Sequence, residues 1–398
     1  MSGSLRADWP QFRGPDGQGH AAAKALPLEW SETENVAWKT AVPGQGWSSP
    51  VIAGGRIWLT TALDDGKSLR AVCVDAGDGK ILHDVEVFTP EKPTPLHAKN
   101  SYASPTPVLD RGRVFVHFGA MGTAALDAAT AEVLWKNEEL VIDHETGPGV
   151  SPVLFENLLI VPFDGTDVQY VAALDARTGR VVWRRDRSAP MREEPSMHRA
   201  FATPLVVEAA GKRQLVSPAA DQVHAYDPAT GEELWHVRYV GYSNVPRPVF
   251  GNGLVYVCTG FGKPQLWAIR PDGTGNVTDS HVAWKFTGQA PAKPSPVLVG
   301  NRLYLVHDQG TATCLNAETG ETVWQKRLGG NYSASPLFAD GRIYFSNEEG
   351  TTTVLAHADE PQVLATNSLA DGFMASPAVA DGALFLRTMT GLYRIEER

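Results

Sequence analysis

The sequence has few cysteines, no long apolar run and no excess of basic residues, and each shortage excludes a class of protein. Its three cysteines, Cys73, Cys258 and Cys314, are far apart, and each lies in an apolar, strand-like segment. We therefore expect buried thiols rather than metal ligands or nucleophiles. No apolar stretch approaches the roughly 18 residues that cross a bilayer, so no membrane-spanning segment is predicted. The formal net charge of -10 argues against nucleic-acid binding, because phosphate recognition depends on clustered Lys and Arg.

The first seven residues lack the pattern of a signal peptide. Met1 to Ala7 contain no hydrophobic stretch, so we do not expect them to be an intact signal peptide. Turn-forming and apolar residues are abundant instead. The chain contains 38 Gly, 28 Pro and 43% hydrophobic residues, enough for a large core with many turns.

A short phrase recurs along the chain. It consists of Ser-Pro, Thr-Pro or Arg-Pro, an apolar pair, a turn and an alternating apolar strand. Eight prolines mark its copies: Pro50, Pro107, Pro152, Pro204, Pro248, Pro296, Pro336 and Pro377. Alternating apolar runs between turn residues are typical of half-buried strands joined in hairpins. Pro is tolerated at the residue that opens a strand, because no ladder hydrogen bond is lost there.

A second phrase, Ala-Leu-Asp-Ala-x-Thr-Gly-x-x-x-Trp, follows in several of these units. Its clearest copies span residues 125–135, 173–183, 225–235 and 314–324, and residues 73–83 form a variant with His83 in place of Trp. The Asp side chain can accept backbone N–H bonds within a turn, and Gly supplies a positive φ. We expect the Trp to lie between adjacent sheets.

Together the two phrases predict an all-β fold, an eight-bladed β-propeller of four-stranded antiparallel blades. The eighth unit, residues 377–394, lacks a fourth strand, whereas residues 35–40 (NVAWKT) closely match the fourth strand of the fifth unit, residues 281–286 (HVAWKF). We therefore expect residues 35–40 to complete blade 8, which leaves no open sheet edge. The predicted domains are an N-terminal arm, residues 1–34, and a single propeller, residues 35–398.

These repeats resemble the PQQ-like, quinoprotein-type β-propeller family over residues 35–394. The family includes quinoprotein alcohol dehydrogenases and the propeller lipoprotein of the outer-membrane β-barrel assembly machinery. The opening motif Asp8-Trp9-Pro10-Gln11-Phe12-Arg13-Gly14-Pro15 is similar to the start of a large group of exported bacterial proteins with such repeats. The resemblance implies the propeller fold and a periplasmic or otherwise exported location, but little about chemistry.

The resemblance does not extend to the quinone cofactor. In the quinoprotein dehydrogenases of this family, PQQ lies between a Trp and a disulfide of adjacent cysteines, and Glu, Asn and Asp hold a Ca²⁺ ion. This sequence has no adjacent cysteines and lacks the larger size and insertions of those enzymes. We therefore expect no bound PQQ, and the identity of any other cofactor stays open.

Candidate ligand-binding residues fall on one face of the predicted ring. By resemblance, that face carries the active sites of quinoprotein enzymes and is built by two sets of loops, those before the innermost strands and those joining second to third strands. The residues that these loops supply are Trp47, His97, Asn100, Tyr102, His144, Asp164, Asp167, Arg192, Asn244, Arg247, Lys293, His307, Asp308, Asn331 and Tyr332.

The two longest of these loops, residues 88–102 and 188–200, favour a functional role, because ordered loops of that length are often functional. The second loop carries Glu194, His198 and Arg199, which we predict as catalytic candidates. A carboxylate, an imidazole and a guanidinium can bind an anionic or sugar ligand and transfer a proton. The alternative is a solvated loop whose charges pair with one another.

Two possible metal sites are weaker. His97, His144, His198 and His307 could converge on a metal ion, but nothing in their spacing indicates it, and surface or hydrogen-bonded histidines are favoured. The oxygen-rich insertion at residues 272–279 resembles a calcium loop without the distal Glu, so an enlarged hairpin turn is favoured there. No metal site is predicted.

Three functions follow from these patterns. We favour an exported propeller that binds a small polar molecule or serves as a scaffold for a protein partner, because the repeat is regular and the quinone machinery is missing. The first alternative is a lyase, hydrolase or isomerase acting on a carbohydrate or small polar substrate in a polar funnel formed by blades 1–4. The second is a PQQ-dependent oxidoreductase. We expect a monomer in each case.

Overall fold

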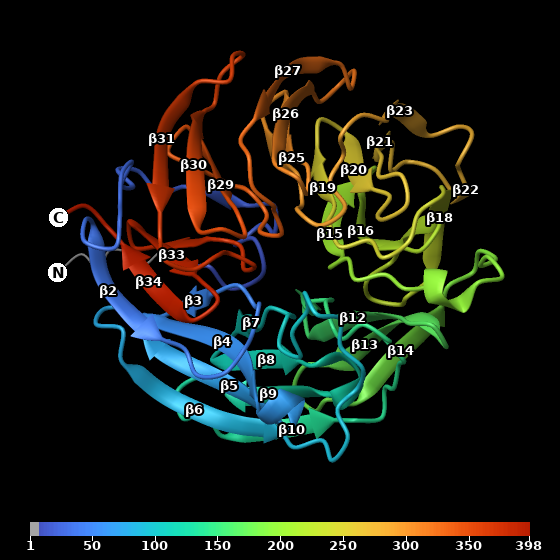
Figure 1. Ribbon diagram of the computed structural model, residues 1–398. Helices are drawn as coiled ribbons and strands as arrows, with labels where there is room; N and C mark the ends of the chain where they lie inside the picture. The colour runs from blue at the N-terminus through green and yellow to red at the C-terminus, as the bar shows by residue number, and fades with distance from the viewer. Residues whose placement is uncertain (1–7) are drawn as a thin grey trace.

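Eight small sheets form a closed ring around a central channel in the computed structural model, which describes residues 8–398 (Figure 1). Each sheet contains the four antiparallel strands of one blade, and two of the sheets carry one further short strand, so the predicted all-β, eight-bladed propeller is confirmed. The expectation for Met1 to Ala7 lies outside the described residues. In the part of the chain that the structure describes, no helix is long and apolar enough to cross a membrane.

The strands of each blade run from the channel to the rim, and the first half of the chain forms four blades. Blade 1 contains β3 (Val51–Ala53), β4 (Arg56–Leu63), β5 (Ser68–Asp75) and β6 (Ile81–Phe88). Blade 2 contains β7 (Val108–Asp110), β8 (Arg113–His117), β9 (Thr123–Asp127) and β10 (Val133–Asn137). Blade 3 contains β11 (Val153–Phe155), β12 (Leu158–Asp164), β13 (Gln169–Asp175) and β14 (Val181–Asp186). Blade 4 contains β15 (Leu205–Ala209), β16 (Lys212–Ala219), β17 (Gln222–Tyr226) and β18 (Glu233–Arg238).

The second half repeats this arrangement. Blade 5 contains β19 (Val249–Gly251), β20 (Leu254–Cys258), β21 (Leu266–Ile269) and β23 (Val282–Phe286). Blade 6 contains β24 (Val297–Val299), β25 (Arg302–Val306), β26 (Thr311–Asn316) and β27 (Thr322–Arg327). Blade 7 contains β28 (Leu337–Ala339), β29 (Arg342–Ser346), β30 (Thr351–Ala356) and β31 (Val363–Ser368). Blade 8 contains β32 (Ala378–Ala380), β33 (Ala383–Arg387), β34 (Gly391–Ile395) and β2 (Val36–Ala41).

Blade 8 joins the two ends of the propeller. Strand β2 pairs antiparallel with β34, with Lys39 opposite Tyr393 and Thr40 opposite Leu392. In Figure 1 the blue strand β2 lies beside the red strand β34. The predicted closure by residues 35–40 is therefore confirmed, with the strand itself spanning Val36–Ala41. Because β2 supplies the fourth strand of blade 8, strand β34 is paired on both sides and leaves no unpaired edge.

The core lies between neighbouring sheets rather than at the centre of the ring. Between blades 1 and 2, for example, Trp58 and Leu69 belong to the same buried cluster as Val114 and Leu126. Each blade therefore buries both faces, and the alternation of apolar residues in each strand serves two interfaces.

A β-bulge interrupts the pairing of the third and fourth strands in every blade. It adds one residue to the fourth strand, so that side chains on either side of the bulge point to the same face of the sheet. The residue just before the bulge is aliphatic in six blades: Val36, Ile81, Val133, Val181, Val282 and Val363. It is Thr322 in blade 6 and Glu233 in blade 4.

The Trp of the second phrase connects one blade to the next, as expected. The Trp135 indole Nε1 of blade 2 donates to the carbonyl oxygen of Ala176 in blade 3, at 3.1 Å. A Cβ at Gly179, in the turn after Ala176, would lie 2.5 Å from the Trp135 ring. His83 takes the same place in blade 1, where its Nε2 lies 3.1 Å from the carbonyl oxygen of Ala129.

Two short strands add to the ring. Strand β22 (Gly275–Asn276) belongs to the insertion in blade 5 and pairs parallel with β18 on the outer edge of blade 4. Strand β1 (His20–Ala21) pairs parallel with β28, the innermost strand of blade 7. The remaining regular elements are three short 3-10 helices, Asp64–Gly66, Gly119–Met121 and Pro195–Met197.

Residues 8–20 run across one end of the channel. Trp9 exchanges two backbone hydrogen bonds with Ile52 of blade 1, and the carbonyl oxygen of Pro10 accepts from Leu109 of blade 2. On the other side, the side-chain oxygen of Gln18 accepts from Phe250 of blade 5, and His20 Nε2 lies 2.6 Å from the carbonyl oxygen of Leu298 of blade 6. These contacts lie at the downstream ends of the innermost strands, opposite the loops that carry the candidate site.

Candidate functional site: a blind central cavity

A cavity of about 670 Å³ occupies the centre of the ring. Its walls come from the loops that precede the innermost strands in all eight blades and from two loops that join second to third strands, in blades 5 and 6. Phe12, in the segment that crosses the far end of the channel, also lines it. The cavity is therefore a blind pocket with Phe12 in its floor, not a pore through the ring.

A belt of hydroxyl groups surrounds the cavity at the residue before each anchoring proline. The seven members of this hydroxyl belt are Ser49, Thr106, Ser151, Thr203, Ser295, Ser335 and Ser376, and all are buried. Each hydroxyl accepts a hydrogen bond from the backbone N–H of the corresponding residue in the preceding blade, at 2.9–3.0 Å. The last of these bonds, from Ser376 N–H to Ser49 Oγ, joins blade 8 to blade 1.

This belt explains the Ser/Thr-Pro repeat in physical terms. The hydroxyl satisfies a buried N–H of the neighbouring blade, and the following Pro has no N–H that would need a partner. Because the oxygen of each hydroxyl accepts from the backbone, its proton is free to point towards a molecule in the cavity. The belt can thus donate several hydrogen bonds to polar oxygens at one height of the channel.

Blade 5 departs from the belt because Arg247 stands at its position. The Arg247 backbone N–H still donates to Ser295, but its side chain turns to the floor. There, Nη1 donates to the carbonyl oxygen of Phe12 at 2.6 Å, and Nε donates to the carbonyl oxygen of Pro204 at 3.1 Å. Arg247, predicted to bind a ligand, therefore holds the segment that closes the cavity.

Charged side chains bridge the mouth of the cavity. Glu348, in the loop between β29 and β30 of blade 7, accepts from Lys293 Nζ of blade 6 at 2.8 Å and from Lys99 Nζ of blade 2 at 3.3 Å. Burial raises the pKa of Glu348, but hydrogen bonds from Lys293 and Ser333 outweigh it and lower this pKa below its ordinary value. Lys293 Nζ also lies 3.9 Å from the Asp308 carboxylate.

Three guanidiniums, those of Arg13, Arg247 and Arg387, are buried near the channel. Burial lowers the pKa of Arg13 to about 9, that of Arg247 to about 10 and that of Arg387 to about 9. Among the described residues, none of the three has a carboxylate within ion-pair distance. Arg387 donates instead to the Ser48 hydroxyl and to the carbonyl oxygens of Ser48 and Thr60. These groups add positive potential around the cavity.

Seven of the sequence-predicted residues line the cavity. They are Trp47, His97, Asn100, Arg199, Lys293, Asp308 and Asn331. They come from blades 1, 2, 4, 6 and 7, so the site is not restricted to the first half of the ring. Arg199 is paired with Glu145 of the preceding loop.

The catalytic candidates do not converge, because only Arg199 lines the cavity. His198 Nε2 lies 2.6 Å from the carbonyl oxygen of Arg192. Glu194 caps the short helix Pro195–Met197 by accepting from Ser196. Arg192 itself pairs with Asp221. The contacts of this loop therefore agree with the alternative interpretation, in which its polar groups bind one another.

Asp164 lies in the interface between blades 3 and 4, where both of its oxygens accept hydrogen bonds from the Arg187 guanidinium at 2.6 and 2.9 Å. Both side chains are 1% exposed, so Asp164 serves this buried ion pair and is shielded from the cavity. Asp167 Oδ1 accepts from the backbone N–H groups of Asp143 and Val168 in a turn.

The other predicted residues support the cavity wall. His144 is buried against Phe201, and burial lowers its pKa to about 4. The Tyr102 hydroxyl donates to the carbonyl oxygen of Thr94. Asn244 and Tyr332 are buried, and His307 Nδ1 accepts from the backbone N–H of Gln309.

Sequence reasoning missed the hydroxyl belt, Phe12 and the aromatic wall residues Phe201, Tyr242 and Phe261. The signal for the belt was present, because seven of the eight anchoring prolines follow Ser or Thr. Phe12 could not be found this way, since only the folded chain shows where the arm passes.

The cavity residues do not fit the quinone site that the resemblance implies. Cys73, Cys258 and Cys314 are free, buried in different blades and absent from the cavity lining. The carboxylates Glu348 and Asp308 share the Lys293 ammonium, which takes the position that a cation would need between them. The four histidines weighed as metal ligands also stay apart, since the one His/Cys/Asp/Glu group close enough to share an ion among residues 8–398 contains none of them.

Known proteins with similar sequences and structures point to one family. A family model described as outer membrane protein assembly factor BamB matches residues 25–138, 70–210 and 167–396. BamB of Yersinia pestis is 25% identical over 201 residues, which are 46% of this chain and 49% of that protein. A tetrathionate hydrolase of Acidithiobacillus ferrooxidans is 24% identical over 259 residues, 61% of this chain and 49% of that protein. The chain thus spans about half the length of these curated relatives.

Solved structures agree on the fold. BamB from Moraxella catarrhalis superposes with a TM-score of 0.61 at 14% identity, over 90% of this chain and 99% of that one. A europium-containing methanol dehydrogenase superposes with a TM-score of 0.70 at 11% identity, over 97% of this chain and 90% of that one. At such identities the structures show the fold alone. Because the family model covers nearly the whole ring, this chain belongs to the BamB-type family of PQQ-like repeat propellers.

Proposed function

We propose that this chain is a binding propeller of the bacterial cell envelope that holds a small, polar, anionic molecule in its central cavity. The observation that carries this proposal is the form of the cavity: one end of the channel is closed by residues 8–20, and the wall presents hydroxyl groups from seven blades. The cavity volume of about 670 Å³ is within the size range of small-molecule sites.

The charge of the lining favours an anion. Lys99, Arg199 and Lys293 line the cavity, and the carboxylates of Glu348, Glu145 and Asp308 pair with them. The excess positive charge comes from Arg13, Arg247 and Arg387, which are buried near the channel and have no carboxylate within ion-pair distance among the described residues. The chain as a whole carries a formal net charge of -10, so this positive cavity stands against the overall balance. Clefts lined by one sign of charge concentrate ligands of the opposite sign. A sugar acid, with hydroxyls for the belt and a carboxylate for the cations, matches both features.

Binding without turnover is the better supported reading of this site. General acid–base catalysis needs a titratable group within hydrogen-bond reach of the substrate. Of the predicted catalytic residues, His198 and Glu194 bind within their own loop, and only Arg199 lines the cavity. The imidazole and carboxylate that do line it, His97 and Asp308, accept hydrogen bonds from the backbone N–H groups of Lys99 and Ala292. Arginine stays protonated at neutral pH, so it positions an anion rather than exchanging a proton.

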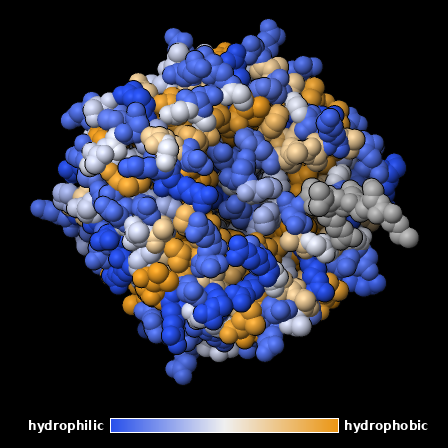
Figure 2. Space-filling view, turned by 180° about the vertical axis from the view of Figure 1, so that it is seen from behind, coloured by the Kyte–Doolittle hydropathy of each residue, from blue (hydrophilic) through white to orange (hydrophobic). Residues whose placement is uncertain are grey.

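The family supports a location in the cell envelope, because the relatives are named as outer membrane protein assembly factors. That name also supports a scaffold role with a protein partner as the second candidate. Val240 and Phe261 are 79% and 43% exposed, and Phe261 lines the cavity, so part of the rim is apolar. Elsewhere apolar residues form separate patches among hydrophilic ones, as Figure 2 shows for the face seen from behind.

Calorimetric titration tests the proposal. Glucuronate and galacturonate are compared with glucose and galactose, and PQQ with Ca²⁺ is titrated in parallel. We expect a uronate to bind at least tenfold more tightly than the neutral sugar of the same ring. The variant Arg199→Gln should lose about tenfold in affinity, because one charge-assisted hydrogen bond is worth about 1.5–3 kcal/mol.

Arg213→Gln is the matched control, because Arg213 also belongs to blade 4 and pairs with Glu156 on the outside of the ring. It should leave uronate affinity unchanged. Equal affinity of the Arg199 variant and the native chain would contradict the proposed site. Absence of binding by every small molecule would favour the scaffold, and conversion of a bound sugar would favour an enzyme.

A further inference from the structure

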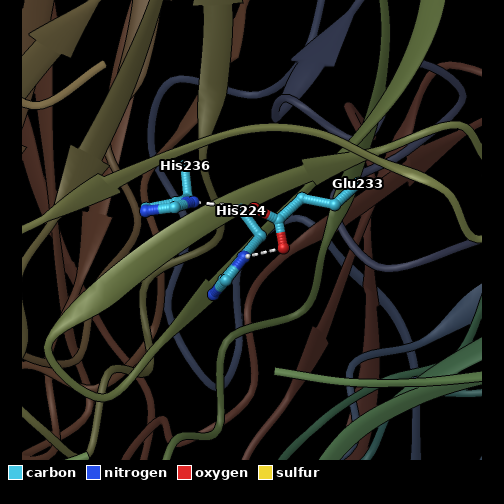
Figure 3. Close-up of side chains that lie close together, drawn as sticks. All are labelled: His224, Glu233 and His236. Atoms are coloured by element: carbon cyan, nitrogen blue, oxygen red, sulfur yellow. Dashed lines mark hydrogen bonds and ion pairs between the residues drawn. The ribbon is translucent and has the colours of Figure 1, made fainter. Parts of the chain in front are cut away.

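A second polar cluster lies far out in blade 4 and belongs to no part of the cavity. His224 of β17 and Glu233 and His236 of β18 meet on one face of the sheet (Figure 3). Glu233 lies between the two imidazoles, with Oε2 3.2 Å from His224 Nδ1 and Oε1 2.7 Å from His236 Nδ1. The three potential ligand atoms all lie within 4.8 Å of one another.

The backbone explains why these three side chains converge. His224 stands directly opposite His236, and Glu233 stands opposite Tyr226. A regular strand would place Glu233 and His236 on opposite faces, because they are three residues apart. The β-bulge between them adds one residue to β18 and brings both side chains to the face that carries His224.

The other blades show that the fold itself does not require these residues. At the position of Glu233 they carry an aliphatic residue or, in blade 6, Thr322. At the positions of the His pair, blade 3 has Ala172 and Arg184, and blade 6 has Thr313 and Gln325. Blade 4 therefore replaces three ordinary positions of one repeat with three metal-ligand residue types that touch.

Buried and polar groups surround the cluster. His224 is buried, and its Nε2 has no hydrogen-bond partner among the described residues. The nearby Arg187 is neutralised by Asp164. Ser188 Oγ, 2.5 Å from Glu233 Oε2, adds an oxygen from the segment that joins blades 3 and 4.

We propose that His224, Glu233 and His236 form a zinc site that fastens the outer part of blade 4 next to blade 3. Two imidazoles and one carboxylate are ligands that Zn²⁺ prefers, and water or Ser188 would complete a tetrahedron. Zinc–ligand bonds of about 2.0–2.1 Å place neighbouring ligand atoms about 3.4 Å apart. The observed Glu–His separations of 2.7 and 3.2 Å need to widen by less than an ångström, and the separation between the two imidazole nitrogens is at most 4.8 Å before an ion draws them together.

The ion would replace the hydrogen bonds that now link Glu233 to the two histidines. Its site lies between strands whose register is fixed on both sides, since β22 pairs with β18 at His236 on the outer edge. A site on paired strands is preorganised, so little chain entropy is lost on binding. Zinc binding is expected to raise the stability of the protein and to be independent of ligand binding in the cavity.

The test uses the full-length protein after dialysis against EDTA. Zn²⁺ alone is titrated by calorimetry, bound zinc is counted by atomic emission, and Co²⁺ is used as a spectroscopic substitute. We expect one zinc per chain, a visible Co²⁺ spectrum of tetrahedral intensity, and a melting temperature raised by about 3 °C or more at a hundredfold excess over Kd.

The variants borrow residues that the fold already accepts. His224→Thr, Glu233→Thr and His236→Gln together install the residues that blade 6 carries at these positions, and His236→Ala removes one of the two half-buried ligands. Both should lower zinc affinity at least tenfold. The control, His281→Ala, removes a histidine that lies 3.5 Å from Asp272 but has no second His, and it should bind zinc like the native chain. No zinc uptake by the native chain, or equal uptake by His236→Ala, would overturn the proposal.

Discussion

At the residue scale, the titratable side chains buried in this all-β ring include an ion pair, histidines whose pKa is lowered by burial, and guanidiniums without a carboxylate partner. The Asp164–Arg187 ion pair is fully enclosed between blades 3 and 4 and is satisfied by two short hydrogen bonds. His117 and His144 are buried without a charged partner of this kind, and burial lowers the pKa of His117 to about 3 and of His144 to about 4. Because the pKa of these histidines differs between the folded and the unfolded chain, the free energy of unfolding depends on pH.

We predict that acid weakens the fold between pH 6.5 and about 4. In this range the unfolded chain binds protons at His117 and His144, whose ordinary pKa is about 6.5, whereas the folded chain does not. The stability from the lowered pKa values is therefore complete above pH 6.5 and falls as the pH falls. At pH 5 each histidine should account for about 2 kcal/mol of the loss.

Urea unfolding at pH 7, 6 and 5 measures this effect. The variant His117→Gln keeps a polar side chain without a titrating group and should reduce the loss between pH 7 and pH 5. His97→Gln changes an exposed histidine at the cavity mouth and serves as the control. An identical pH dependence in all three proteins would show that the buried histidines are not responsible.

At the element scale, one contact is repeated between blades: the Trp of a fourth strand packs on the glycine of the next turn. The contact needs a residue with a positive φ and no side chain, because Gly179 has a φ of 73° and faces the Trp135 ring. The spacing of Asp, Gly and Trp in the second phrase therefore places the Gly of one blade against the Trp of the blade before it.

We predict that Gly179→Ala destabilises the protein by about 2–4 kcal/mol. The backbone conformation costs an Ala about 1–2 kcal/mol, and the new methyl would lie 2.5 Å from the Trp135 ring, which adds an overpacking cost. The loss is measured as a lower midpoint of urea unfolding.

Gly211→Ala separates the two causes. Gly211 has a φ of 71°, close to that of Gly179, but nothing lies within 4 Å of a Cβ built on it. It should cost only the backbone term of about 1–2 kcal/mol. If both variants lose the same stability, the Trp contact contributes nothing and the interpretation of the repeat is wrong.

At the scale of the whole molecule, the first forty residues close the structure twice. Strand β2 closes the ring by pairing with β34, and residues 8–20 close one end of the channel through contacts with blades on both sides. The amino-terminal segment thus both completes the ring of blades and closes one end of its central channel.

We predict that removal of residues 1–40 leaves β34 unpaired and causes aggregation or loss of cooperative unfolding, because an exposed strand edge pairs with other chains. Size-exclusion chromatography and thermal melting measure the outcome. Removal of residues 1–7 is the control, since it keeps β1, β2 and the floor of the cavity. An unchanged melt after removal of residues 1–40 would refute closure by β2.

The sequence alone was sufficient for the architecture, since turn residues and strand periodicity are local and recur once per blade. The eight anchoring prolines predicted eight blades. The missing fourth strand at one end and the spare strand at the other predicted that these two segments pair. The Asp-to-Trp phrase also predicted a contact between sheets, because its spacing leaves the Trp on the strand that ends each blade.

The site was decided by tertiary structure. Residues such as His198 and Asn331 occupy comparable loops in the sequence, yet only the second reaches the cavity, because the direction of each side chain depends on hydrogen bonds within its own loop. The floor made by Phe12 joins residues that no local pattern connects, and Glu233 reaches His224 and His236 only because a β-bulge brings it to their face of the sheet. The Ser/Thr-Pro repeat was visible in the sequence, but only the closed ring shows that its hydroxyls surround one cavity. The repeat determined which ring forms, and the packing of the arm and the bulges determined what the ring can hold.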